Sequence, residues 1–176
     1  FGFMAFYPGP GIGGHCIPSD PMYLAWKARA HGFEPRFIEL ADQTNRYMPH
    51  HVVDKVTQGL NTQRKALNGT RVLLLGMAYK RDVNDVRDSP AFDVAQELIA
   101  RGAEVSFHDP FVASVEVNGK TLRSVPLTAA SLKSVDCAVG GMVMVNDVIA
   151  EACAGSTVRV CVNCATRTSH GRRSRA

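Results

Sequence analysis

Residues 71–76 read RVLLLG, and this short run decides the fold. Four consecutive apolar residues are typical of a strand that is buried on both faces, as in a parallel sheet. Asn68-Gly69 supplies a turn before the run, and a polar loop over 77–88 follows it. We therefore expect the first strand of an α/β domain here.

Helix and strand patterns alternate downstream of this strand. Ser89-Pro90 suits the start of a helix, and Gly102 suits its end. The run EVSFH over 104–108 predicts a second strand. The rest of the series is a small hairpin at 117–120, a helix near 127–133, a strand at about 137–145, a helix over 146–154 and a strand over 157–162. The alternation predicts an α/β fold with a Rossmann-like parallel sheet.

The residues before this domain show loop and helix patterns and no strand pattern. Residues 1–18 form a Gly/Pro-rich loop, and the flanking signals predict a helix from about 21 to 30. A longer helical pattern covers about 37–67, with Pro49 as a candidate break. We expect two units, a helical one over 1–68 and the Rossmann-like domain over 69–176.

The net charge of +4 belongs to the end of the chain. Residues 167–176 hold four Arg and no acid, and the other 166 residues hold 16 basic and 16 acidic groups. A neutral body argues against a nucleic-acid-binding face. Apolar stretches are too short for a membrane span, and no signal peptide is evident, so we expect no membrane partner.

The cysteines indicate a reducing compartment. There are five, an odd number without a close-spaced framework, which fits a cytoplasmic protein. Cys161 and Cys164 form a C-x-x-C pair, but no second pair stands at zinc-finger spacing. We therefore expect no metal site.

The first loop points to chemistry at a cysteine. Residues 8–16 read PGPGIGGHC, and its glycines allow the backbone to approach a ligand closely. A helix N-terminus just after Cys16, with His15 beside it, favours the reactive thiolate. Asp20 could then assist water or a proton. The plainer alternative stays open: Asp20 as a helix cap, Cys16 as a small packing residue and the glycines as a tight turn.

The second loop suits an anionic ligand. It reads MAYKRDVNDVRDSP over 77–90, at the carboxyl end of the first predicted strand, where open α/β sheets bind ligands. Three cations and three acids alternate in it, so a solvated loop with local ion pairs is the alternative. No G-x-G-x-x-G fingerprint follows the strand. Asp109 stands where a ribose-binding acid often sits, although Asp-Pro is also a common turn start.

Together these motifs resemble one enzyme family. FYPGPGIGGHCIPSDPMYLAWKA over 6–28 resembles the catalytic-cysteine segment of the nucleotide-sugar 6-dehydrogenases, the UDP-glucose/UDP-N-acetylhexosamine dehydrogenase family. RVLLLGMAYKRDVNDVRDSP over 71–90 resembles the opening of their UDP-binding domain, and FHDPF over 107–111 resembles its second strand. The sequence around Cys16 resembles the UDP-N-acetylglucosamine/UDP-N-acetylmannosamine branch more closely than the UDP-glucose branch.

The resemblance implies a reaction and roles for particular residues. The family oxidises the sugar C6 alcohol to a carboxylate in two NAD-dependent steps. Cys16 would form a thiohemiacetal and then a thioester, and Asp20 would assist its hydrolysis. The remaining roles follow the same motifs: Phe6, Tyr7, Gly9, Gly11 and Gly13 would line the sugar loop, Lys80 would face the nucleotide-sugar, and Arg87 would face the NAD diphosphate.

The chain also departs from the family pattern. The family's NAD-binding domain and its catalytic lysine and asparagine, which precede the cysteine segment, are not in this sequence. A family run like VDTRNA is replaced by VCVNCA over 160–165, through divergence or a shifted reading frame. We therefore expect residues 1–68 to be the remnant of a helical central domain in a C-terminal fragment that does not turn over alone.

Two other classes of function remain open. One is a nucleotide-binding module without chemistry, and the other is a dimerisation piece built on the long helix. The resemblance favours a UDP-sugar as the small-molecule partner and a homodimer as the assembly.

Overall fold

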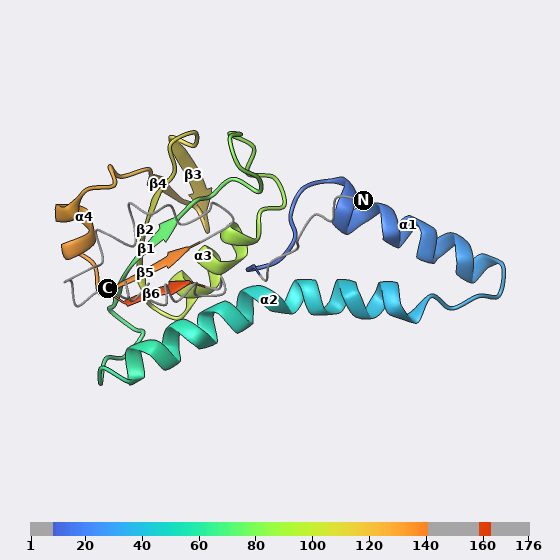
Figure 1. The fold of residues 1–176 in the computed structure, drawn as a ribbon, viewed down its shortest axis with the longest axis horizontal. Helices are drawn as coiled ribbons and strands as arrows, with labels where there is room; N and C mark the ends of the chain where they lie inside the picture. Colours follow the sequence, from blue (N-terminus) through green and yellow to red (C-terminus); the bar gives the residue numbers. More distant parts are fainter. Residues whose placement is uncertain (1–8, 141–158, 163–176) are drawn as a thin grey trace, which may run out of the picture.

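The structure is a computed structural model that describes residues 9–140 and 159–162 (Figure 1). Phe6, Tyr7, the predicted helix over 146–154 and the basic end lie outside the described residues, as does the expected strand beyond Gly140.

The predicted parallel sheet is confirmed. Its strands are β1 (Arg71–Leu75), β2 (Glu104–His108), β5 (Cys137–Gly140) and β6 (Arg159–Val162), in the order β2-β1-β5-β6. All three pairings are parallel, and Leu75 pairs with both His108 and Gly140. The carboxyl ends of β1, β2 and β5 therefore share one edge of the sheet.

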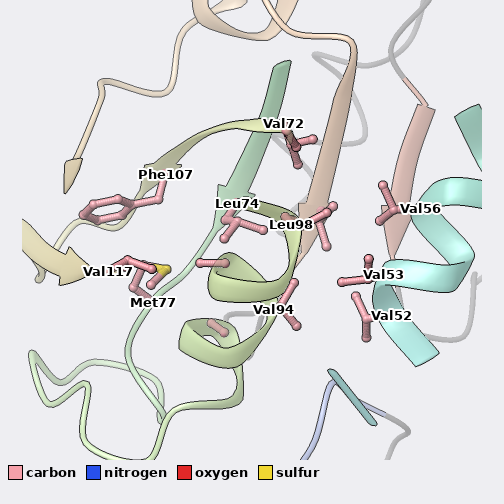
Figure 2. Close-up of a cluster of buried hydrophobic side chains, with 14 of the residues drawn as sticks. Val52, Val53, Val56, Val72, Leu74, Met77, Val94, Leu98, Phe107 and Val117 are labelled. Carbon is pink, nitrogen blue, oxygen red and sulfur yellow. The ribbon is translucent and has the colours of Figure 1, made fainter. Parts of the chain in front are cut away.

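Helices cover both faces of this sheet, because β1 is apolar on both sides. Val72 and Leu74 pack toward α3 (Pro90–Ala100) and α2 (Arg36–Asn61), as Figure 2 shows. Leu73 and Leu75 pack with Leu132 of α4 (Ala129–Lys133) in a second cluster. This alternation is the period-two pattern of a strand between two apolar layers.

The first helix begins earlier than predicted. α1 spans Cys16–Ala30, so the expected start at Pro21 is wrong. Pro18 falls in the first turn, where backbone N–H groups have no intrahelical partner, and Pro21 is accommodated inside the helix. Asp20 lies within the helix, so its alternative role as the helix cap is also wrong.

The second helix is continuous through Pro49. α2 spans Arg36–Asn61, so it has no break at Met48-Pro49 and ends before Leu67. Pro49 costs one backbone hydrogen bond, but its ring is buried and the helix packs along α3. Burial of that face outweighs the local penalty.

α1 and α2 form a long hairpin that projects away from the sheet, while the far end of α2 runs beside α3 (Figure 1). The three valines of that end, Val52, Val53 and Val56, share one hydrophobic cluster with β1 and α3 (Figure 2). The expected boundary at 68/69 thus falls between α2 and β1, yet part of α2 supplies the core of the α/β domain.

The predicted hairpin is confirmed as β3 (Ser114–Val117) and β4 (Lys120–Arg123). Asn118 and Gly119 both have positive φ, at 50° and 74°, as a two-residue type I′ turn requires. α4 starts at Ala129 because Thr128 and Ser131 form a capping box. Within the described residues, no helix combines the length and apolarity needed to cross a bilayer.

Candidate active site

The structure brings the two sequence-predicted loops together. The cysteine loop (residues 9–15) lies against the β1–α3 loop (residues 76–89). A Cβ placed on Gly13 would lie 2.4 Å from the carbonyl oxygen of Asp88, and one on Gly14 would lie 2.7 Å from Cε2 of Tyr79. Both glycines are buried. At these positions glycine is needed for contact between the two loops.

α2 holds the cysteine loop from another side. The side-chain amide of Asn45 accepts from the backbone N–H of Ile12 at 2.6 Å and donates to the Ile12 carbonyl at 3.0 Å. Asn45 lies seven residues after Ile38 and seven before Val52, so it occupies the inward face of α2. That periodicity is the signal that could have identified it, and sequence reasoning missed it.

Cys16 is the first residue of α1, and its side chain is exposed. Asp20 follows one helical turn later and is also exposed, so the thiol and the carboxylate share one side of the helix. The N-terminal end of a helix favours negative charge. Both side chains are therefore accessible to a ligand at the N-terminal end of α1.

The cations of the β1–α3 loop differ in their contacts. Arg87 forms a two-pronged pair with Asp85, with Nη2 to Oδ2 at 2.6 Å and Nε to Oδ1 at 2.9 Å. Lys80 is exposed, and in the described part of the chain no hydrogen bond or ion pair engages it. Lys80, like the equally exposed Arg81, is therefore more readily available to an anionic ligand than Arg87, which would have to share its guanidinium.

The two loops are also coupled electrostatically. The pKa of Asp85 falls to about 2, chiefly because the Arg87 side chain bonds to it, and the Arg87 backbone N–H adds to this. His15 of the cysteine loop makes a smaller contribution in the same direction. The pKa of Arg87 rises through the same pairing.

The predicted glycines of the sugar site lie on the cysteine loop. Gly9, Gly11 and Gly13 lie on the cysteine loop, whose neighbours include Pro90 and Asn45 as well as Tyr79. Sequence reasoning missed Tyr79, which touches Gly14 and directly precedes Lys80. Within the described ranges 9–140 and 159–162, no three metal-ligating side chains gather as a metal site.

Two family models match the chain. The UDP-binding domain of the UDP-glucose/GDP-mannose dehydrogenase family matches residues 73–158, and the central domain of the same family matches residues 1–47. Together the two matches cover about three quarters of the sequence. The central-domain match ends within α2, and the UDP-binding-domain match begins within β1.

Similar curated proteins carry related activities in their names. The chain is 36% identical to the UDP-N-acetyl-D-glucosamine 6-dehydrogenase of Pseudomonas aeruginosa, over 64% of this chain and 26% of that protein. It is 38% identical to the UDP-glucose 6-dehydrogenase AglM of Haloferax volcanii, over 58% of this chain and 23% of that protein. The chain thus spans about a quarter of the length of these relatives.

A solved structure shows the same arrangement. The NDP-N-acetyl-D-galactosaminuronic acid dehydrogenase of Methanosarcina mazei superposes with a TM-score of 0.68 at 25% identity. The similarity covers 86% of this chain and 34% of that one. With two domain models of one family matched in order and the parallel sheet in place, the chain belongs to the UDP-glucose/GDP-mannose dehydrogenase family.

Proposed function

We propose that this chain is the C-terminal part of an NAD-dependent UDP-sugar 6-dehydrogenase that converts the sugar C6 alcohol to a carboxylate. The observation that carries the proposal is the contact of Gly13 and Gly14 with the β1–α3 loop. That contact sets the N-terminus of α1, with Cys16, beside the loop that offers Lys80. A nucleotide held at the loop would extend its sugar toward the thiol.

Each side chain then has a chemical task. The thiolate of Cys16 attacks the C6 aldehyde to give a thiohemiacetal, and loss of a hydride and a proton leaves a thioester. Water hydrolyses the thioester to the acid and restores the thiol, and Asp20 takes up the proton of that water. Lys80 offsets the negative charge of the diphosphate. Phe6, Tyr7 and the glycines Gly9, Gly11 and Gly13 are proposed to line the sugar site.

NAD, when bound, supplies the hydride acceptor for both oxidations. The residues here fit only part of that cofactor: Arg87 is exposed and can meet a diphosphate, but no glycine fingerprint follows β1. We therefore expect chain 1–176 alone to reduce no NAD with any UDP-sugar. A measurable rate of NADH formation would contradict this expectation.

The proposed substrate is a UDP-N-acetylhexosamine. The motif GHCIPSDP over 14–21 supports this substrate, because its sequence resembles the N-acetylhexosamine branch of the family more closely. Identity to the two relatives is nearly equal, so a direct comparison is needed. Titration of the chain with UDP-N-acetylglucosamine, UDP-N-acetylmannosamine and UDP-glucose should rank either N-acetyl sugar first.

Alkylation of Cys16 tests the proposed site. Iodoacetamide should modify the exposed Cys16 faster than the buried Cys137, with the rate read for each peptide by mass spectrometry. A UDP-sugar should slow the reaction at Cys16, whereas UDP should slow it much less, because only the former carries a sugar to the thiol. Equal protection by both ligands would favour a nucleotide-binding module without chemistry. Lys80→Ala should weaken both ligands, and Lys120→Ala, on the hairpin, is the matched control.

We also propose a homodimer assembled in the cytoplasm. The odd cysteine count supports a reducing compartment, and the exposed apolar side chains of the α1–α2 hairpin support association. This second point also favours the alternative role as a dimerisation module.

A further inference from the structure

Asp109 follows β2 at the sheet edge where dinucleotide-binding folds place a ribose-binding acid. Its surroundings differ from that role. Oδ2 accepts from the backbone N–H groups of Met77 at 2.8 Å and Ala78 at 3.1 Å. Oδ1 accepts from those of Phe111 at 2.8 Å and Val112 at 3.1 Å. Only 4% of the residue is exposed.

These four bonds use the full capacity of the carboxylate. An ionised carboxyl offers about four acceptor sites, and four N–H donors occupy them here. The backbone of Asp109 is fixed as well, because its N–H donates to Ser124 Oγ and its carbonyl accepts from that hydroxyl, each at 3.0 Å. A ribose hydroxyl could bind Asp109 only by displacing a buried backbone donor, which would then be left unsatisfied.

The bonds to Met77 and Ala78 fix the start of the β1–α3 loop. These two residues directly precede Tyr79 and Lys80, and the Gly76 N–H is held by the His108 carbonyl at 2.8 Å. The loop therefore leaves β1 tied to the end of β2 at three consecutive amides. Tyr79 then contacts the cysteine loop at Gly14.

We propose that Asp109 is a positioning residue for the nucleotide site: it clamps the loop that carries Lys80 and does not bind the ribose itself. The role rests on the proposed UDP site for its functional consequence. In a dinucleotide-binding Rossmann fold, an acid at this position would be expected to bind the ribose. Here the carboxylate of Asp109 instead accepts hydrogen bonds from buried backbone N–H groups.

Titration of chain 1–176 with UDP and 2′-deoxy-UDP separates the two roles. In Asp109→Asn the amide group faces N–H donors, so the loop shifts and the affinity for both nucleotides should fall by about tenfold. The ratio of the two affinities should stay that of the wild type, because no ribose contact is lost. A ratio that collapses toward one would show that Asp109 binds the ribose and would overturn the proposal.

Asp136→Asn is the matched control. Asp136 accepts from the Arg71 backbone N–H and bonds Lys65 at the opposite end of β1, so its loss should reduce thermal stability but change UDP affinity less than about twofold. Unchanged UDP affinity in folded Asp109→Asn would also overturn the proposal. If that variant does not fold, Asp109→Glu retains the charge and displaces the carboxylate, and the same ratio is measured.

Hydrogen exchange on the wild type tests the clamp without any ligand. The amides of Met77, Ala78, Phe111 and Val112 lie outside the strands, yet they should exchange as slowly as those of β1. Fast exchange would refute the clamp. If the wild type binds no UDP while these amides are protected, the proposed function fails and the clamp stands.

Discussion

Gly13 shows how a single residue sets the site. Its buried position leaves no room for a methyl group, since a Cβ would lie 2.4 Å from a backbone oxygen of the β1–α3 loop. Gly13→Ala should destabilise the chain by about 2 kcal/mol or detach the cysteine loop, because backbone must move. Urea unfolding measures the change, and exposure of Tyr79 to solvent reports the detachment.

Gly9→Ala is the control for that substitution. A Cβ at Gly9 would meet nothing within 4 Å, so its unfolding free energy should change by less than about 0.5 kcal/mol. Equal losses in the two variants would mean that the two loops are not in close contact.

Asp136 should make the free energy of unfolding depend on pH. Its pKa is well below the usual range, first because Lys65 bonds to it and then because the Arg71 N–H does. A carboxyl whose pKa is lowered by folding stabilises the protein above its unfolded pKa of about 4, and that contribution is lost as pH falls further. Asp136→Asn should therefore cost about 1–2 kcal/mol at pH 7 and less as the pH falls from 4 toward 2.

Thermal melts from pH 7 to pH 2 measure this effect. Glu116→Gln is the comparison, because Glu116 is exposed and makes no ion pair in the part of the chain that the structure describes. A constant difference between Asp136→Asn and the wild type across the whole range would exclude Asp136 as the source of the pH dependence.

The sequence suggested candidate residues that carry obvious chemistry, but it did not indicate the contacts that Asn45 and Asp109 make. Cys16, Asp20 and Lys80 carry reactive or charged groups in recognisable motifs, so their candidacy is local information. Asn45 and Asp109 act through partners 31–33 residues away. Such pairings arise only once helices and strands have packed, and no local pattern encodes them fully.

At the scale of elements, α2 has two different halves. Val53, in the second half, is fully buried beside β1 and α3, whereas Leu40, in the first half, is 58% exposed. Val53→Ala should lower the unfolding free energy by about 2 kcal/mol through lost burial and a cavity. Leu40→Ala should change it by less than about 0.5 kcal/mol, and chemical denaturation measures both.

The outcome would locate the edge of the folding unit. A small effect of Val53→Ala would mean that the α/β domain folds without α2, as a boundary at 68/69 implies. The expected large effect would make the second half of α2 part of that domain.

The sequence predicted strands better than helix ends. β2 and the hairpin were located because alternation and an Asn-Gly turn are local signals. A helix start at Pro21 and a break at Pro49 were both wrong, because each proline lies inside a continuous helix. Proline lowers the local helix preference, but tertiary packing decides the result. The order of the sheet also required the register of non-adjacent strands.

At the scale of the whole molecule, the α1–α2 hairpin lacks a cover among the described residues. Ala25 is the buried residue of α1, while Trp26 is 68% and Phe37 89% exposed. A hollow of about 370 Å³ lined largely by apolar residues lies between the two helices. Apolar surface of this kind marks an association site more often than a solvated face.

We expect this surface to join two copies of the chain. Sedimentation equilibrium should show a concentration-dependent monomer–dimer mixture for the wild type. Trp26→Glu should shift it to monomer, because a charge would have to be desolvated in the interface. Thr121→Glu adds the same charge to the exposed β3–β4 hairpin and should leave the monomer–dimer equilibrium unchanged. A wild type that stays monomeric at every concentration, or an equal shift in both variants, would rule out the α1–α2 hairpin as the dimer contact.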